Sequence, residues 1–263
     1  MKAALCKETV FYEEKGQGPA IILLHGFPLD HRMWQEQADA LQNIYRVITH
    51  DLRGMGQSAV PEDTLTLDRY ADDVLELMDR LGIERAALAG FSMGGYVAFS
   101  LLRKAPDRFN ALILLNTRPE ADPQEGRINR MNMAAALLRN GSAAASEAML
   151  PKLLSEQTRR ERPEFVKKLN EWMLSMHPNG LVHASLAMAF RKDSVSLLPT
   201  IAVPTLIIGG ELDSITTPEV MKRMAEQIKS SRYVIIPGAA HLTVMEKSAE
   251  VNEAILQFLQ GLS

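Results

Sequence analysis

The sequence predicts an α/β protein built on a parallel sheet that helices cover on both faces. Short apolar runs, of the length expected for buried strands, alternate with stretches of helical spacing. Several of these runs end in polar loops that contain glycine, as strands do at the ligand-binding edge of an open sheet. Because strands and helices alternate, we expect right-handed crossovers between parallel neighbours.

Seven segments have the composition of strands, and the helical stretches fall between them. The predicted strands are 10–12, 20–24, 45–49, 85–89, 111–115, 204–208 and 233–236. The predicted helices are 32–42, 66–81, one that begins at Ser92 and ends near Pro106, 218–229 and 248–260. Each helix follows a strand, which is the order that a doubly covered parallel sheet requires.

One long segment interrupts this order. Residues 118–197 carry no strand pattern, only helical stretches separated by proline and glycine. We expect roughly four helices there, enough to cover one end of the sheet. The sequence thus predicts an α/β core made of residues 1–117 and 198–263, with a helical cap made of residues 118–197 inserted into it.

Composition and charge exclude several classes of function. The chain has 263 residues, of which 46% are hydrophobic and 23% charged, as in an ordinary globular protein. The net charge is −3 and no basic run occurs, so we expect neither a nucleic-acid nor a membrane partner. Cys6 is the single cysteine, which excludes an internal disulfide. The first residues turn polar too early for a signal peptide, and no apolar run could span a bilayer, so we expect a cytoplasmic protein.

A glycine-flanked serine follows the fourth predicted strand. The segment after residues 85–89 reads Gly90-Phe91-Ser92-Met93-Gly94, a G-x-S-x-G motif between a strand and a helix. A serine at such a sharp turn must adopt a strained conformation, at a cost of roughly 1–3 kcal/mol. The free N–H groups of the helix that starts there lie where an oxyanion would form. We therefore expect Ser92 to be a nucleophile.

Two further polar residues follow predicted strands and complete a triad. Asp213 and His241 come just after the last two strands, and the carboxyl ends of parallel strands share one edge of the sheet. An imidazole must take the proton of Ser92 to activate it, and a carboxylate must orient that imidazole. Glu211 lies in the same loop as Asp213 and is a rival for the acid. The acidic residues of segment 116–122 are a weaker alternative.

Five blocks of sequence resemble the signature motifs of the α/β-hydrolase superfamily, and the resemblance extends over nearly the whole chain. They are His25-Gly26-Phe27-Pro28, Asp51-Leu52-Arg53-Gly54-Met55-Gly56-Gln57-Ser58, Gly90-Phe91-Ser92-Met93-Gly94-Gly95, Gly210-Glu211-Leu212-Asp213 and Gly238-Ala239-Ala240-His241. The chain is similar to the small members of the 3-oxoadipate enol-lactonase and carboxylesterase type. The resemblance implies a mostly parallel eight-stranded sheet with the cap inserted after its sixth strand.

The resemblance also implies a role for each site residue. Ser92 would be the nucleophile, His241 the general base and Asp213 the orienting acid. The backbone N–H groups of Phe27 and Met93 would form the oxyanion hole, and the same two residues would contact substrate. The Asp51–Ser58 loop would be structural.

These observations together predict a serine hydrolase that cleaves a small-molecule ester or lactone through an acyl-enzyme on Ser92. No metal or organic cofactor is implied. Arg118 follows a strand exit and is a further candidate for substrate contact. Carbon–carbon bond hydrolysis, or haloperoxidase and perhydrolase chemistry without a cofactor, would use the same triad. A non-hydrolysing small-molecule receptor is the alternative from another class.

The remaining histidines lack the spacing of metal ligands. His25 is expected to be a hydrogen-bonded structural residue of the oxyanion loop. The other four are expected on the surface or in the cap: His31, His50, His177 and His183.

Overall fold

An eight-stranded sheet forms the centre of the computed structural model, which describes residues 1–5 and 8–262; Cys6 lies outside the described residues. The order across the sheet is β1-β2-β4-β3-β5-β6-β7-β8. The strands are β1 (Lys2–Leu5), β2 (Glu8–Lys15), β3 (Ala20–Leu24), β4 (Arg46–His50), β5 (Ala86–Phe91), β6 (Phe109–Leu115), β7 (Thr205–Gly210) and β8 (Ser231–Ile236). Strand β1 is the one that the sequence pattern alone did not indicate.

The sheet is mostly parallel, as predicted. Only β2 runs antiparallel to its neighbours, and the six strands from β4 to β8 pair in parallel. Every residue of β5 and β7 is buried, because both strands lie in the middle of the sheet with structure on either face. Because β5 and β7 run in the same direction, their carboxyl ends lie at the same edge of the sheet, where polar side chains can converge.

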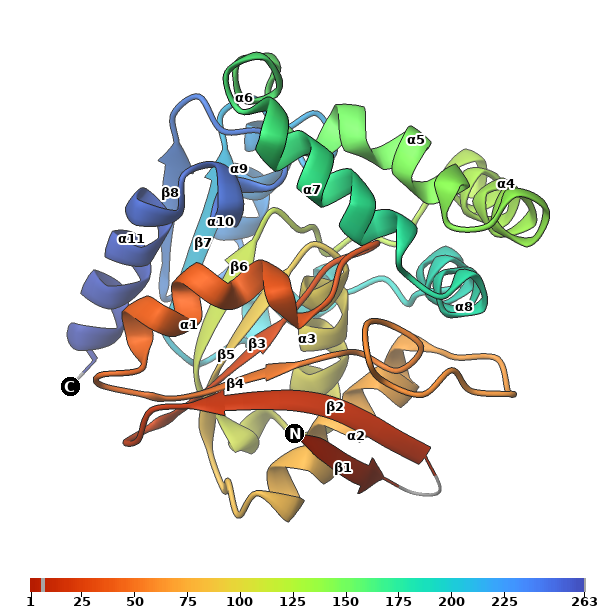
Figure 1. Cartoon of the computed structure of the whole chain (residues 1–263). Coiled ribbons are helices and arrows are strands. Elements are labelled where there is room, and N and C mark those ends of the chain that lie inside the picture. Colours follow the sequence, from red (N-terminus) through yellow and green to blue (C-terminus); the bar gives the residue numbers. More distant parts are fainter. Residues whose placement is uncertain (6–7, 263) are drawn as a thin grey trace.

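Helices cover both faces of this sheet. The core helices are α1 (Gln35–Leu41), α2 (Leu67–Arg80), α3 (Met93–Lys104), α9 (Pro218–Glu226), α10 (Thr243–Glu246) and α11 (Ser248–Gln260), with 3₁₀ turns η1 (His31–Trp34), η2 (Pro106–Arg108) and η3 (Val195–Thr200). Helices α1 and α11 pack together on one face, and α2 and α3 on the other (Figure 1). None of the described helices is long and apolar enough to cross a membrane.

Five α-helices lie between β6 and β7, where the sequence predicted roughly four. They are α4 (Gln124–Asn140), α5 (Ala143–Leu153), α6 (Glu156–Glu161), α7 (Pro163–Leu174) and α8 (Pro178–Ala189). The extra helix arises at Pro163, which begins α7 directly after the short α6 ends. A proline is favoured in the first turn of a helix and not inside one. Figure 1 shows these helices gathered beyond one end of the sheet, and we call them the cap.

A buried ion pair joins the two ends of the cap. Arg191, just after α8, donates to the Asp122 carboxylate at 2.7 Å, and both side chains are almost fully buried. The same guanidinium donates to the carbonyl oxygen of Glu120 at 2.8 Å. It also stacks on the Tyr96 ring of α3, 4.3 Å from the ring centroid. The start and the end of the cap are thereby held together against the core.

Candidate active site

Ser92 stands at a strained turn between β5 and α3. Its backbone has φ 50° and ψ −111°, and residues other than glycine rarely adopt a positive φ. The flanking glycines allow this turn because strand and helix approach closely. A Cβ on Gly94 would lie 2.1 Å from the carbonyl oxygen of Leu24 in β3, and one on Gly90 would lie 2.6 Å from that of Gly94. The turn thus presents the half-buried hydroxyl at the carboxyl edge of the sheet.

The structure brings the three predicted triad residues together. His241 Nε2 lies 2.9 Å from Ser92 Oγ, and His241 Nδ1 lies 2.8 Å from Asp213 Oδ2. The three side chains follow β5, β7 and β8, so the parallel sheet aligns them at one edge. His241 is fully buried and its ring packs 5.2 Å from the Phe91 ring. This geometry allows a proton to pass from the hydroxyl to the imidazole.

A ring of donors surrounds the Asp213 carboxylate. Asn116 Nδ2 donates to Oδ2 at 2.8 Å and the Thr216 hydroxyl does so at 2.6 Å, while the amides of Ile215 and Thr216 donate to Oδ1. Burial raises the pKa of Asp213, but the charge and hydrogen bond of His241 and these other donors outweigh it. The pKa of this carboxyl therefore lies well below its usual range, and Asp213 is ionised at neutral pH.

The rival acids lie elsewhere. Glu211 is exposed and accepts the backbone N–H of Gly238, so it braces the loop before His241 from outside. Asn116 occupies the end of β6, where the alternative acid would lie, and it supplies an amide to Asp213. Its neighbour Thr117 donates its hydroxyl to the carbonyl oxygen of Ser92 at 2.8 Å. Sequence reasoning missed both of these supporting residues.

The two backbone amides predicted to form the oxyanion hole belong to Phe27 and Met93. Met93 is the first residue of α3, and Phe27 lies in the loop that follows β3. Within residues 1–5 and 8–262, neither N–H donates to another protein atom. Amides of a helix's first turn have no partner inside that helix, and an oxyanion hole at the Phe27 and Met93 amides stays a prediction.

His25 has a structural position in the same loop. Its Nε2 accepts the backbone N–H of Leu52 at 2.9 Å, and its Nδ1 faces the carbonyl oxygen of Gly26 at 3.1 Å. Both ring nitrogens are thus occupied by the main chain. Burial lowers the pKa of His25 against the opposing charge of Asp51, so the ring is neutral at neutral pH. These contacts agree with the expected structural role.

Arg118 has a different set of neighbours from the triad. Its guanidinium lies 3.5 Å from Asp122 Oδ1, and its side chain is partly exposed. It lines a small depression with Phe99 and Arg103 of α3. A contact between Arg118 and substrate stays a prediction.

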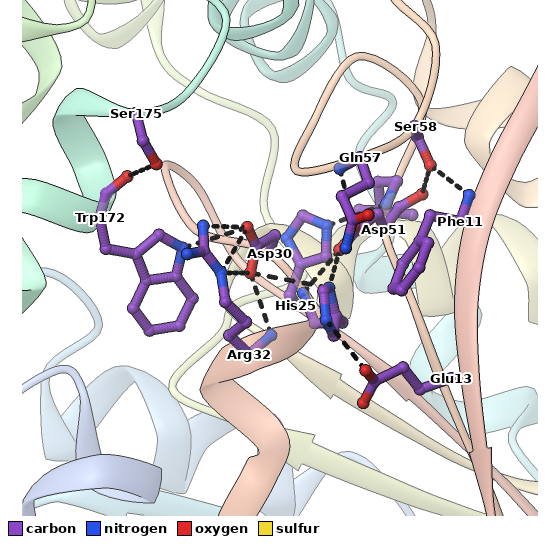
Figure 2. Close-up of polar contacts among 12 residues, drawn as sticks. Phe11, Glu13, His25, Asp30, Arg32, Asp51, Gln57, Ser58, Trp172 and Ser175 are labelled. Atoms are coloured by element: carbon purple, nitrogen blue, oxygen red, sulfur yellow. Dashed lines mark hydrogen bonds and ion pairs between the residues drawn. The ribbon is translucent and has the colours of Figure 1, made fainter. Parts of the chain in front are cut away.

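A second polar cluster lies under η1, and it corrects the expectation for two histidines. His31 and His50 are buried, not on the surface, because both lie where β4 and η1 pack together. His31 Nδ1 lies 2.6 Å from Asp51 Oδ1 and 3.8 Å from Asp30 Oδ1. Figure 2 shows Arg32 and the Trp172 indole converging on the Asp30 carboxylate.

The carboxylate oxygens of this cluster already have protein donors. His31, Asp30 and Asp51 offer ligand atoms within 4.8 Å of one another, as a metal site requires. However, Asp51 accepts the backbone amides of His31 and Gln57, and Asp30 accepts two guanidinium nitrogens. The arrangement is that of a charge-compensated structural cluster.

A groove of about 590 Å³ runs between the cap and the core. Its walls come from α7, from η1 with the start of α1, and from Met245 of α10. Aromatic and apolar side chains such as Phe165 and Trp172 line it together with charged residues of both signs. Its volume is in the range of small-molecule sites. Among the described residues that line it, Met245 is the nearest in the chain to His241, and the lining includes neither the triad nor the predicted oxyanion-hole residues.

The chain belongs to the α/β hydrolase fold family, whose model matches residues 19–248. An esterase from Thermogutta terrifontis, solved with malate bound, superposes with a TM-score of 0.96 at 40% identity, covering 100% of this chain and 98% of that one. The 3-oxoadipate enol-lactonase 1 of Acinetobacter baylyi is 32% identical over 93% of this chain and 90% of its own length. A bifunctional esterase/perhydrolase of Acinetobacter calcoaceticus is 28% identical over 96% of each chain. The predicted family and fold are confirmed.

Proposed function

We propose that this protein is a serine hydrolase that cleaves a carboxylic ester or lactone of a small molecule. The observation that carries the proposal is the unbroken chain of contacts from Ser92 Oγ through the His241 imidazole to the ionised Asp213. A buried, negatively charged partner on Nδ1 keeps the proton there and leaves Nε2 free to accept one. The similarity to an esterase and to an enol-lactonase supports the same reaction class.

The reaction divides into two similar halves. In the first, Ser92 Oγ attacks the carbonyl carbon as His241 Nε2 takes its proton, and that proton then passes to the leaving alkoxide. In the second, water gives a proton to His241, attacks the acyl-enzyme and releases the acid, and Ser92 regains its proton. The Met93 and Phe27 amides stabilise the tetrahedral oxyanion in each half. Asp213 stays ionised throughout and stabilises the imidazolium.

We propose that the groove at the cap–core boundary, whose lining includes Met245 of α10 but no triad residue, receives part of a substrate of modest size. Its volume of about 590 Å³ suits an acyl or alcohol group with apolar character. We therefore expect short- to medium-chain esters to be better substrates than long-chain ones.

Hydrolysis of p-nitrophenyl esters from acetate to octanoate tests this proposal. Wild type should turn over the short esters and react covalently with a fluorophosphonate, and Ser92→Ala should do neither. Ser196→Ala is the matched control because that serine is exposed in η3 and takes part in neither contact of the triad. Fluorophosphonate labelling that persists in Ser92→Ala would refute the assignment of the nucleophile.

The same experiment separates the alternative functions. Labelling of Ser92 without ester turnover would direct attention to carbon–carbon hydrolysis, tested with ring-cleavage diketones. The name of one relative includes perhydrolase activity. In this protein, perhydrolysis would be detected as bromide oxidation in the presence of acetate and hydrogen peroxide. A ligand that raises the melting temperature without being consumed would favour the receptor.

A further inference from the structure

We propose that Glu246 is a positioning residue that couples the cap to His241; this inference rests on the proposed function. Glu246 ends α10 and is almost fully buried. Its Oε2 accepts the backbone N–H of Ala240 at 2.7 Å, directly before the histidine. Its Oε1 accepts the backbone N–H of Ser155 at 2.8 Å, at the start of cap helix α6. One carboxylate therefore joins the histidine loop to the cap.

The amide on the other side of the histidine is also held by the cap. The Leu242 N–H donates to the carbonyl oxygen of Leu153, the last residue of α5, at 2.8 Å. The main-chain N–H groups immediately before and after His241 thus both end on groups fixed by the cap, one directly and one through Glu246. The junction between α5 and α6 forms one side of the histidine loop's support.

A third contact fastens α10 itself. Arg162, between α6 and α7, donates to the carbonyl oxygens of Met245 and Glu246 at 3.2 and 3.4 Å. The N-terminus of α6 is held in place as well, because the Ser155 hydroxyl accepts the backbone N–H of Thr158 and caps that helix. Helix α10 is therefore tied to both ends of α6.

The mechanical consequence follows from the short distance within the triad. His241 Nε2 is 2.9 Å from Ser92 Oγ, and proton transfer depends on that contact. A displacement of about 1 Å at a catalytic group can lower the rate roughly 100-fold. A shift of α6 pulls on Ala240 through Glu246, so the packing of the cap sets the position of the general base. The coupling predicts an effect on kcat and not on substrate affinity.

Glu246→Gln tests the carboxylate, since an amide keeps the volume but accepts with only one oxygen. We expect kcat for p-nitrophenyl acetate to fall between about 10- and 100-fold, with KM within about twofold of wild type. The rate of fluorophosphonate labelling should fall in parallel. Glu250→Gln is the control, because Glu250 is exposed on the neighbouring helix α11. A lowered melting temperature with unchanged kcat would mean a merely structural role and would overturn the inference.

A pair of variants at Ser155 tests the cap side of the link. Ser155 has φ −61° and the preceding residue, Leu154, has φ −117° and ψ 144°, which proline accepts. Ser155→Pro removes the N–H that reaches Glu246, whereas Ser155→Ala keeps it and loses only the helix cap. We expect Ser155→Pro to lower kcat about as much as Glu246→Gln, and Ser155→Ala to keep it.

Equal kcat for the two Ser155 variants would overturn the coupling, even where Glu246→Gln is impaired or fails to fold. The proposed function has its own readout in the wild type. Absence of labelling at Ser92 together with absence of ester turnover would refute that function, whereas an active wild type with fully active variants would refute only the coupling.

Discussion

Replacing Asp213 by asparagine should lower kcat by about 10⁴-fold while leaving the fold intact. In the wild type, Oδ2 accepts from His241 Nδ1, Asn116 Nδ2 and the Thr216 hydroxyl, and Oδ1 accepts from the amides of Ile215 and Thr216. The introduced NH₂ must take the place of one oxygen. At the Oδ1 position it would face two main-chain N–H groups that cannot turn away, with a penalty of roughly 1–3 kcal/mol for each.

At the Oδ2 position the donors facing the NH₂ can all adjust. The Thr216 hydroxyl rotates, and Asn116 can flip because, among the described residues, its Oδ1 accepts from the rotatable Thr243 hydroxyl alone. His241 can change tautomer, so that Nδ1 accepts and Nε2 carries the proton. The network is then restored, and the loss of stability should stay below about 2 kcal/mol. The cost falls on catalysis, because Nε2 can no longer take the Ser92 proton.

The expected loss of kcat is about 10⁴-fold, the size reported for this change in another triad, or about 5 kcal/mol in the barrier. The assay is p-nitrophenyl acetate hydrolysis, with urea unfolding of the same sample and Glu211→Gln as the control. A kcat within tenfold of wild type would refute Asp213 as the orienting acid. Loss of kcat with destabilisation above about 4 kcal/mol would instead refute the argument on the amide's orientation.

Three further predictions concern stability: the first two are measured by urea unfolding and the third by the yield of folded protein. Burial lowers the pKa of His31, but the hydrogen bond and charge of Asp51, together with the charges of Asp30 and Glu13, outweigh it and raise the net pKa. His31→Gln should therefore reduce the free energy of unfolding most below about pH 6.5 and less as the pH rises to about 9, and a difference that grows with pH would contradict this. Asp122→Ala should cost about 3–5 kcal/mol because it leaves the buried Arg191 without its carboxylate, and a cost under about 1 kcal/mol would be inconsistent with that pair's burial. Gly94→Ala should prevent accumulation of folded protein, since the added methyl meets a main-chain carbonyl oxygen of β3; normal yield would show that the turn can widen.

The meeting of the triad residues could be predicted because parallel topology converts sequence position into spatial position. Ser92, Asp213 and His241 each follow an apolar strand, and the carboxyl ends of parallel strands share one edge. The strain at Ser92 was equally accessible, since the flanking glycines have a purely local explanation. What was predictable, therefore, depended on the strand order and on backbone sterics.

The supporting residues could not be predicted in this way. Asn116 and Thr216 reach Asp213 from different loops, and neither has a distinctive spacing or residue type. Glu246 looks like an ordinary helical acid until the cap places the Ser155 amide against it. Such contacts depend on how the cap lies on the core, and helical patterns specify helices without specifying their packing.

The error over His31 has a similar cause. His31 lies in a polar segment between a predicted strand and a predicted helix, where exposed residues are common. Its partner Asp51 lies twenty residues further along the chain. The sheet brings the loops after β3 and β4 side by side, because those strands are hydrogen-bonded neighbours. Only that adjacency buries the ring with two carboxylates.

The Arg191–Asp122 ion pair affects how freely the cap can vary in length. Its partners are 69 residues apart, yet the pair holds the first and last parts of the insertion together. The entropy cost of closing a loop grows only with the logarithm of its length. Residues added between Asp122 and Arg191 should therefore lower the stability of the fold only slightly. The cap therefore begins and ends at nearly the same place on the core, as a short turn between two strands does. Caps of other lengths could therefore be grafted here, provided that the graft retains both ends of this closure and the α5–α6 junction that supports the His241 loop.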